Sequence, residues 1–369
     1  MSIILFLLVL FVLVLVHEWG HFIVAKKTGM RVDEFGIGFP PKLFSVKKGE
    51  TEYTFNALPI GGFVRIWGEN GDEQSSTTEG GQVEAVDYSR SFSHRPKWAQ
   101  ALVLIAGVTM NILFAWFLFS LTYMIGVPTA VDEAVATDSA ELYIAGVLPD
   151  SPASEIPIGS IIQSITSLDI TIDSPTPSEF SDLVSETAPA PLSVTYVSGG
   201  EEAVVEITPV QGLVEGEEDK YIVGASLSLV EIESKSFLVA ISDGAKSTWN
   251  GLAGITVGLS TLIGQSFSGD ADFSQVAGPI GIVGMVGDAA SFGITALLTF
   301  TAIISLNLAV INLLPFPALD GGRLVFVAIE AVTGRQIPPV WAGRVNLAGF
   351  ALLMILMIAV TYNDIIRLF

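Results

Sequence analysis

The chain has 369 residues, of which half are hydrophobic and only 15% are charged. Charged residues make up about a quarter of a typical soluble protein, so the composition excludes an ordinary soluble enzyme. The absence of cysteine excludes disulfides and thiolate sites, and the net charge of −21 argues against nucleic acid as a partner.

Four stretches are apolar and long enough to cross a bilayer, which takes about 20 helical residues. They lie at about 3–25, 99–126, 296–314 and 345–362. Basic residues follow the first stretch and none precedes it, which indicates a retained span rather than a cleaved signal peptide. We therefore predict an α-helical polytopic membrane protein with four transmembrane helices. Its membrane core has two halves, residues 1–126 and 293–369.

The distribution of basic residues predicts the orientation of these spans. Residues 26–97 hold ten of the 17 Lys and Arg, whereas 127–292 hold three of them against 24 Asp and Glu. The first loop is therefore expected on the cytoplasmic side. The acidic segment and both termini are expected outside.

The connecting segments carry their own patterns. Residues 51–56 and 62–67 alternate in the period of strands around a turn at 57–61, which predicts a membrane-associated β-hairpin on the cytoplasmic side. The polar residues 69–89 predict a mobile loop. Short β-rich stretches predict an extracytoplasmic domain at 127–235.

Residues 236–292 are harder to place, because 237–263 are apolar enough to suggest a fifth span but are interrupted by polar residues. We interpret 236–292 as an amphipathic interfacial segment. Insertion of 237–263 into the membrane stays open as the alternative.

Two of the three histidines form the pattern His17-Glu18-Trp19-Gly20-His21 inside the first span. Residues four apart share one helical face, so both imidazoles can reach one zinc ion while Glu18 acts on a water molecule. The alternative is a pair of core histidines satisfied by hydrogen bonds. Ionisable residues within a span are costly and usually functional, which favours the metal site.

Asp320 is the predicted third ligand, because it is the only acidic residue between Asp288 and Glu330. The third histidine, His94, lies in a basic stretch at the mouth of the second span. With four spans Asp320 falls just past the cytoplasmic end of the third, at the depth of His17; a fifth span would put it on the outer side. A helix-capping role for Asp320 is the alternative.

Several motifs together resemble the site-2 protease family of intramembrane zinc metalloproteases, in its bacterial RseP-type branch. They are HEWGH at 17–21, GIGFPPKLF at 36–44, LPIGGFVRIWGE at 58–69, AGVTMN at 106–111, SPAS at 151–154, AGPIGI at 277–282 and NLLPFPALDGG at 312–322. The resemblance implies one Zn²⁺ per chain, bound by His17, His21 and Asp320, with Glu18 as general base. It also implies that 127–235 form a single PDZ-like domain.

The resemblance further implies the biological setting. The substrates would be single-span membrane proteins already trimmed outside by a site-1-type protease, such as an anti-sigma factor, or remnant signal peptides. The protein would be a multi-pass protein of the bacterial cytoplasmic (inner) membrane, with the active site toward the cytoplasmic side. The chain departs from the family at Val108, where a proline is common, and at Ser160, where PDZ domains often have aspartate.

A helical substrate must become extended to be cut, and an exposed strand edge can pair with its freed backbone groups. The candidate edge consists of Gly61, Gly62, Phe63, Val64 and Arg65. Asn312, within the family motif, is a further candidate for binding the substrate backbone. The alternatives are an ordinary interfacial hairpin anchored by Phe63 and Trp67, and an Asn312 that satisfies backbone near Pro315 and Pro317.

Two other function classes compete with a protease. A non-catalytic membrane adaptor would have no need of Glu18. A metal transporter would need several intramembrane ligand clusters along a path, whereas the sequence has one.

Overall fold

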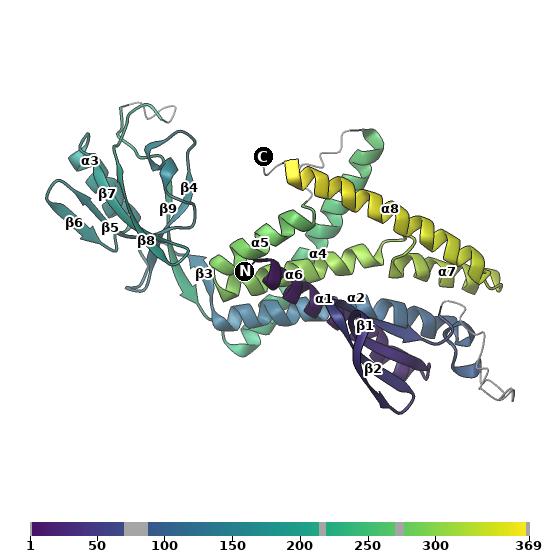
Figure 1. Cartoon of the computed structure of the whole chain (residues 1–369). Helices are drawn as coiled ribbons and strands as arrows, with labels where there is room; N and C mark the ends of the chain where they lie inside the picture. Colours follow the sequence, from purple (N-terminus) through teal and green to yellow (C-terminus); the bar gives the residue numbers. More distant parts are fainter. Residues whose placement is uncertain (1, 70–87, 214–218, 270–276, 367–369) are drawn as a thin grey trace. The chain divides into compact units, whose positions relative to one another are not determined.

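The computed structural model describes residues 2–69, 88–213, 219–269 and 277–366 (Figure 1). The chain forms two compact units. A membrane unit combines Met1–Leu121 with Leu238–Phe369, and a β-rich unit comprises Thr122–Phe237. The predicted loop at 69–89 lies outside the described residues, apart from its ends.

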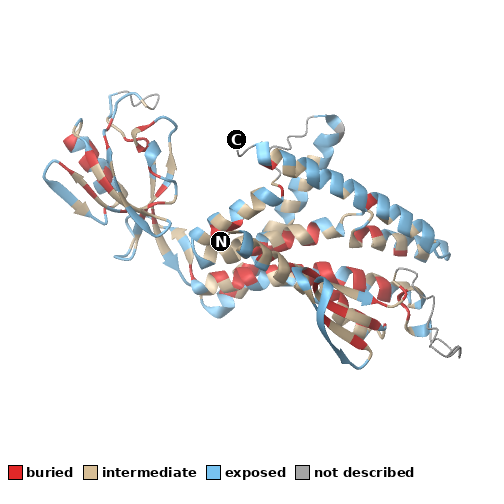
Figure 2. Ribbon diagram, in the orientation of Figure 1, coloured by how far each residue is buried: buried red, intermediate tan, exposed pale blue. Residues whose placement is uncertain are grey.

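Four helices in the described residues are long and apolar enough to cross a membrane, as predicted. They are α1 (Ser2–Lys27), α2 (Lys97–Ile125), α6 (Ile294–Leu313) and α8 (Pro339–Ile366). In the most apolar stretch of α2, 50% of the residues are buried, whereas the share is 6% in the corresponding stretch of α8. Helix α2 is therefore central in the unit, while most of α8 is exposed along its length (Figure 2). Many of the exposed α8 residues are large and apolar.

Helix α2 packs closely on α1 and on α6. A Cβ atom at Gly20 of α1 would lie 2.5 Å from the Ala106 carbonyl oxygen of α2, so this crossing requires a residue without a side chain. Farther along α2, Ala115 and Leu118 form a buried cluster with Ala302 and Leu306 of α6. Close approach through small residues is the usual way in which membrane helices associate.

Strands β1 (Val32–Lys48) and β2 (Thr51–Ile66) form a sheet beside α1 and correct the predicted hairpin. Residues 34–37 pair with 62–65 on one side and with 52–55 on the other. The predicted strands 51–56 and 62–67 therefore do not pair with each other, because the start of β1 lies between them. Each long strand folds back on itself near Gly38 and Gly61, which have φ of 79° and 86°. Residues 62–66 form an edge with a single strand neighbour in the described sheet.

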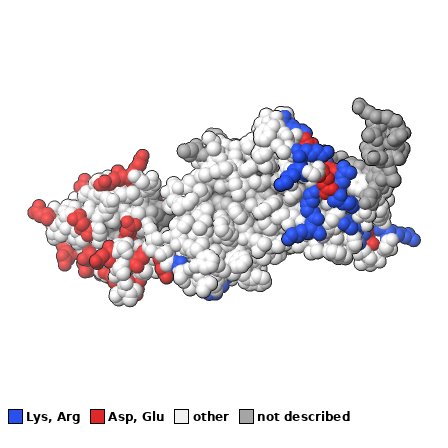
Figure 3. Space-filling view, turned by 90° about the horizontal axis from the view of Figure 1, so that it is seen from below, with Lys and Arg blue, Asp and Glu red and all other residues white. Residues whose placement is uncertain are grey.

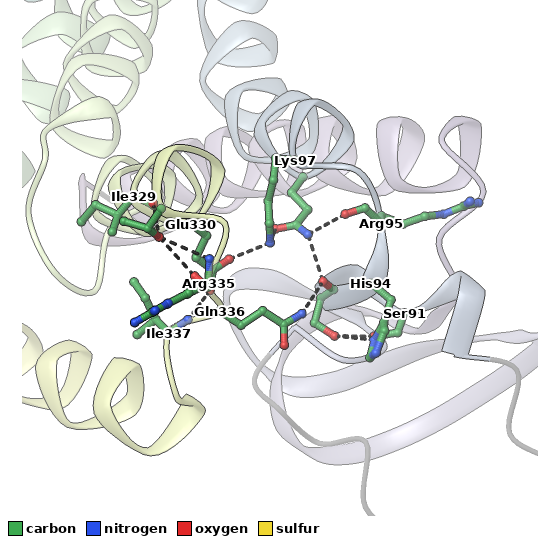
Figure 4. A network of polar contacts seen from close by, with 12 residues as sticks. Ser91, His94, Arg95, Lys97, Ile329, Glu330, Arg335, Gln336 and Ile337 are labelled. Atoms are coloured by element: carbon green, nitrogen blue, oxygen red, sulfur yellow. Dashed lines mark hydrogen bonds and ion pairs between the residues drawn. The ribbon is translucent and has the colours of Figure 1, made fainter.

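Two short 3-10 helices, η1 (Tyr88–Arg90) and η2 (Phe92–His94), lead into α2. Just beyond them, Lys97 donates to Glu330 at 2.6 Å, and Glu330 also accepts from the Ile337 amide at 2.7 Å. Gln336 reaches the Ser93 carbonyl at 3.4 Å (Figure 4). This network joins the start of α2 to α7 (Asp320–Thr333) and to the turn that follows it.

Helix α4 (Phe237–Ser268) contains the segment 237–263 and is not one of the four candidate spans. Its first half rests on α2, where the Trp116 indole donates to the Ile241 carbonyl at 2.9 Å. Helix α5 (Pro279–Ser291) follows. Its first turn is capped by Asp364 of α8, which accepts from the Gly278 and Gly281 amides at 3.0 and 2.9 Å.

The β-rich unit is a seven-stranded sheet with one helix packed on it. The strand order is β3-β9-β4-β5-β7-β8, with β6 paired to β5. The strands are β3 (Val127–Ala130), β4 (Glu141–Val147), β5 (Ile161–Ser167), β6 (Ile170–Asp173), β7 (Leu192–Ser198), β8 (Glu201–Ile207) and β9 (Ala225–Glu233). A 3-10 helix, η3 (Pro152–Glu155), follows β4, and α3 (Pro177–Thr187) begins with a capping box formed by Thr176 and Glu179.

Charge differs between the two units. Asp and Glu side chains gather on the β-rich unit, whereas Lys and Arg gather on the part of the membrane unit that carries β1 and β2 (Figure 3). At the turn between these strands, Glu50 accepts from Arg90 at 2.6 Å and from Lys26 at 2.6 Å. The hydrogen bond from Arg90 and that from Lys26 lower the pKa of Glu50 to about 2. This ion-pair cluster fixes the turn against the end of α1.

Candidate metal centre

Helix α1 places His17 and His21 one turn apart on its buried face. Their side chains are 8% and 11% exposed, and their Nε2 atoms lie 3.1 Å apart. Glu18 follows His17 directly and is only partly buried. A single helical turn therefore presents two imidazoles to one point and keeps a carboxylate beside them.

The third member of the cluster comes from the other half of the chain. Asp320 is the first residue of α7, and its Oδ2 lies 3.0 Å from Nε2 of His17 and 3.3 Å from Nε2 of His21. The turn before it bends sharply at Ala318, where φ is 77°. Added Cβ atoms at Gly321 and Gly322 would overlap the carbonyl oxygens of Leu314 and Phe316. The two glycines therefore let α7 begin tightly against this turn.

The donor set fits a zinc ion. Among the described residues, one group of His, Asp and Glu side chains has the compactness of a metal site, and it consists of His17, His21 and Asp320. Ligand atoms about 2.0–2.1 Å from a tetrahedral zinc lie about 3.3 Å from one another. The observed separations of 3.0, 3.1 and 3.3 Å agree with that value. Two nitrogens and one carboxylate leave a fourth position open, as catalytic zinc sites do.

The Asp320 carboxyl carries the charge that such a site needs. A carboxylate binds a metal in its deprotonated form, so Asp320 would bring one negative charge to the ion.

Helix α2 supplies the surroundings of the two histidines. Nδ1 of His21 donates to the Val103 carbonyl at 2.8 Å, which leaves its Nε2 free to bind a metal. Nδ1 of His17 lies 3.3 Å from the Asn111 side chain. Between these contacts a Cβ at Gly107 would come within 2.8 Å of Nε2 of His17 and closer still to Nε2 of His21. Only glycine leaves the ligand nitrogens room.

Two cavities meet the site. One of about 220 Å³ is lined by His17, Glu18, Asn312 and Asp320, among others. The other, of about 150 Å³, is lined by Glu18, His21, Asp320 and residues of the β2 edge. Glu18 and Asp320 belong to both. The site is thus bordered by a cavity on each side.

The structure brings some of the predicted substrate-binding residues to these cavities and not others. Asn312 lines the first cavity, and Phe63 and Val64 line the second. Gly61 lies against Val14 of α1, and the close approach at Gly62 is to the Gly36 carbonyl within the sheet. Arg65 pairs with Glu34 at 3.2 Å.

The structure also places His94 and three residues of α2 that lie around the histidines. His94 lies away from the metal cluster and contacts Ser93. The α2 residues around the histidines were not predicted, although their spacing of four, at 103, 107 and 111, is readable in the sequence.

The sequence profile of peptidase family M50 matches residues 5–356. The chain belongs to this family. A protein of Clostridium perfringens is 37% identical over 369 residues and covers 99% of both chains. Zinc metalloprotease RasP of Oceanobacillus iheyensis is 31% identical over 439 residues, covering 100% of this chain and 99% of its own. The regulator of sigma-W protease RasP of Bacillus subtilis is 31% identical over 442 residues, with the same coverage.

This M50 peptidase is therefore a membrane-bound zinc metalloprotease of the site-2 type, and zinc is its cofactor.

Proposed function

We propose that this M50 peptidase cuts single-span membrane proteins within their transmembrane segments, as a step of regulated intramembrane proteolysis. The observation that carries the proposal is the position of the centre. His17 and His21 lie within an apolar helix long enough to span a membrane, and Asp320 reaches them from the turn after another such helix. A peptide bond cut here must lie at the depth of the membrane, which favours a transmembrane segment as the substrate.

Glu18 is the proposed general base. When bound, zinc polarises the scissile carbonyl and acidifies a water molecule. Glu18 lines both cavities beside the three ligands, so its carboxylate can take a proton from the attacking water. The same group then passes that proton to the nitrogen of the leaving amine. Glu18 need not bind the metal itself, because His17, His21 and Asp320 are the three protein ligands.

The edge of β2 is the proposed binding site for the extended substrate. A strand at residues 62–66 has one described strand neighbour, so its other edge can pair with a peptide. Phe63 and Val64 of this edge line the cavity that contains Glu18. Asn312, across the site, would hydrogen-bond the same peptide. Gly61, Gly62 and Arg65 take part by shaping and holding the edge.

The proposed orientation puts the metal centre toward the cytoplasmic side of the bacterial cytoplasmic membrane. The basic surface beside β1 and β2 would face the cytoplasm, as the positive-inside rule requires, and the acidic β-rich unit and both termini would lie outside. Helix α4 would lie at the outer interface with the lipid bilayer.

The β-rich unit would select substrates that a site-1-type protease has already trimmed, such as an anti-sigma factor, or remnant signal peptides. We assign it as a single PDZ-like domain at 127–235. A cavity of about 510 Å³ lies between α3 and β9 and is lined by Phe180, Val184 and the segment 221–227. It would receive an exposed peptide end, or the unit would exclude bulky outer domains. Deletion of 127–235 should relax the selection for trimmed substrates.

Substitution at Glu18 tests the proposal. Purified Glu18→Gln should cleave no single-span substrate yet bind about one zinc per chain, because the change leaves all three ligands in place. Asp320→Ala should lose both zinc and activity. Trp19→Gln is the matched control, because Trp19 is the neighbouring helix residue and is half exposed. Cleavage by Glu18→Gln at the wild-type rate would refute the base assignment, and a preference for soluble proteins would refute the substrate class.

A further inference from the structure

One face of α2 lies along the two zinc-binding histidines. Val103, Gly107 and Asn111 are spaced four apart, as are His17 and His21 on α1, so each group forms one helical stripe. Val103 accepts from Nδ1 of His21, and Gly107 leaves room for both rings. Asn111 ends this stripe beside His17.

Asn111 is fully buried in a span, where an amide is costly unless it is paired. Its side-chain nitrogen lies 3.3 Å from Nδ1 of His17. Its Oδ1 has no hydrogen-bond partner among the described residues. Its backbone carbonyl separately accepts from the Ser305 hydroxyl of α6 at 2.8 Å. Among the described residues, the side chain thus has a single hydrogen-bond contact, and its partner is a metal ligand.

The chemistry of histidine decides which end of the amide faces His17. A histidine that binds zinc through Nε2 carries its proton on Nδ1, and that N–H needs an acceptor. The oxygen and nitrogen of a primary amide have nearly the same shape, and a half-turn about the terminal torsion exchanges them. Oδ1 has no hydrogen bond to lose in this half-turn. One atom of the amide is unpaired in either orientation, Oδ1 before the turn and the nitrogen after it.

We propose that Asn111 is a positioning residue for the zinc site, whose Oδ1 accepts the Nδ1 proton of His17. This contact fixes the ring orientation and the tautomer that presents Nε2 to the metal. The backbone of Val103 performs the same task for His21. Outer partners of this kind are worth about 10- to 100-fold in metal affinity.

Zinc affinity of the full-length chain in detergent tests the proposal, measured by competition with a chelator. Asn111→Leu keeps the number and branching of the side-chain heavy atoms but has no acceptor, and should bind zinc about 10- to 100-fold more weakly. Asn111→Asp keeps an oxygen at the same place and should recover most of the loss. Ser305→Ala is the matched control, because it removes the neighbouring hydrogen bond to the Asn111 backbone without touching the amide. It should leave zinc affinity unchanged.

Two outcomes of these substitutions would overturn the proposal. One is wild-type zinc affinity in a folded Asn111→Leu chain. The other is an equal loss in Asn111→Leu and Ser305→Ala, which would mean that Asn111 serves only helix packing.

A measurement on the unsubstituted chain does not depend on the folding of variants. The chain has three histidines, so nitrogen-15 labelling gives a simple spectrum, in which zinc-loaded His17 should carry its proton on Nδ1. An unprotonated Nδ1 would refute the role.

Discussion

The substitution Gly107→Ala should disable the metal centre, although it adds only one methyl group. The new Cβ would lie 2.7 Å from Cε1 and 2.8 Å from Nε2 of His17, and closer still to Nε2 of His21. Carbon atoms in ordinary contact are about 3.5–4.0 Å apart. Both rings would therefore have to turn aside, or α1 and α2 would have to separate by about 1 Å, as these distances imply.

The magnitude follows from what must move. Forcing one extra methyl group into a packed interior costs about 1–3 kcal/mol of stability. Turning the rings also breaks the contact of His21 with Val103 and moves both nitrogens off the metal. The loss of zinc affinity should then be at least that of losing one outer hydrogen bond, about 10- to 100-fold. The stability loss and the zinc loss should appear together.

Zinc content after dialysis, zinc affinity and cleavage rate would be measured on the purified variant and on a matched control. Gly343→Ala is that control, because Gly343 lies in helix α8 and a Cβ there would meet nothing within 4 Å. It should bind zinc normally and be as stable as the wild type, or up to about 1 kcal/mol more stable. If Gly107→Ala retains one zinc with wild-type affinity and full activity, the packing of α2 on the histidines is not what holds the site.

Three other predictions concern parts outside the centre. Because the pKa of Glu50 is lowered to about 2, its ion pairs should stabilise the β1–β2 turn above the ordinary pKa and lose that effect as pH falls toward 2. The protection of the turn amides from hydrogen exchange, corrected for the intrinsic exchange rate at each pH, should therefore fall over this range in the wild type and stay constant in Glu50→Gln. Asp364→Ala should destabilise the chain by about 1 kcal/mol in denaturant unfolding, because it removes the cap of α5, and Asp364→Asn should lose less. Successive residues of a strand point their N–H groups to opposite edges, so only one of the variants Val64→Pro and Arg65→Pro should spare the pairing with β1. That variant should fold and bind zinc but cleave its substrate slowly. A normal cleavage rate in that variant would exclude strand addition.

The sequence predicted the membrane architecture because long apolar runs need no knowledge of distant contacts. It also nominated His17, His21 and Asp320, which the structure brings together across 303 positions. The nomination was feasible because the chain is poor in histidine and because few acidic residues lie near the spans. The spacing of four along one helix identified two of the three residues. The number of spans, four rather than five, placed the third at the same depth in the membrane.

Other features could not be predicted, because they depend on pairing between distant segments. The alternation at 51–56 and 62–67 correctly indicated strands, but no local signal shows that residues 34–37 lie between them. That order follows from where β1 folds back at Gly38. Similarly, Val103 acts through a backbone carbonyl, which every residue has. Gly107 is a spacer only because α1 crosses α2 at that level, and this crossing is a tertiary fact.

The attachment of the β-rich unit has a consequence for how such chains can diversify. Its first and last strands are neighbours, since Val127 of β3 pairs with Glu233 of β9, and the Lys235 amide donates to the Tyr123 carbonyl at 2.9 Å. The polypeptide therefore leaves and returns at almost one point. A module joined in this way can be lengthened, duplicated or lost while the two halves of the peptidase keep the same connection, so the β-rich unit is free to evolve separately from the metal centre.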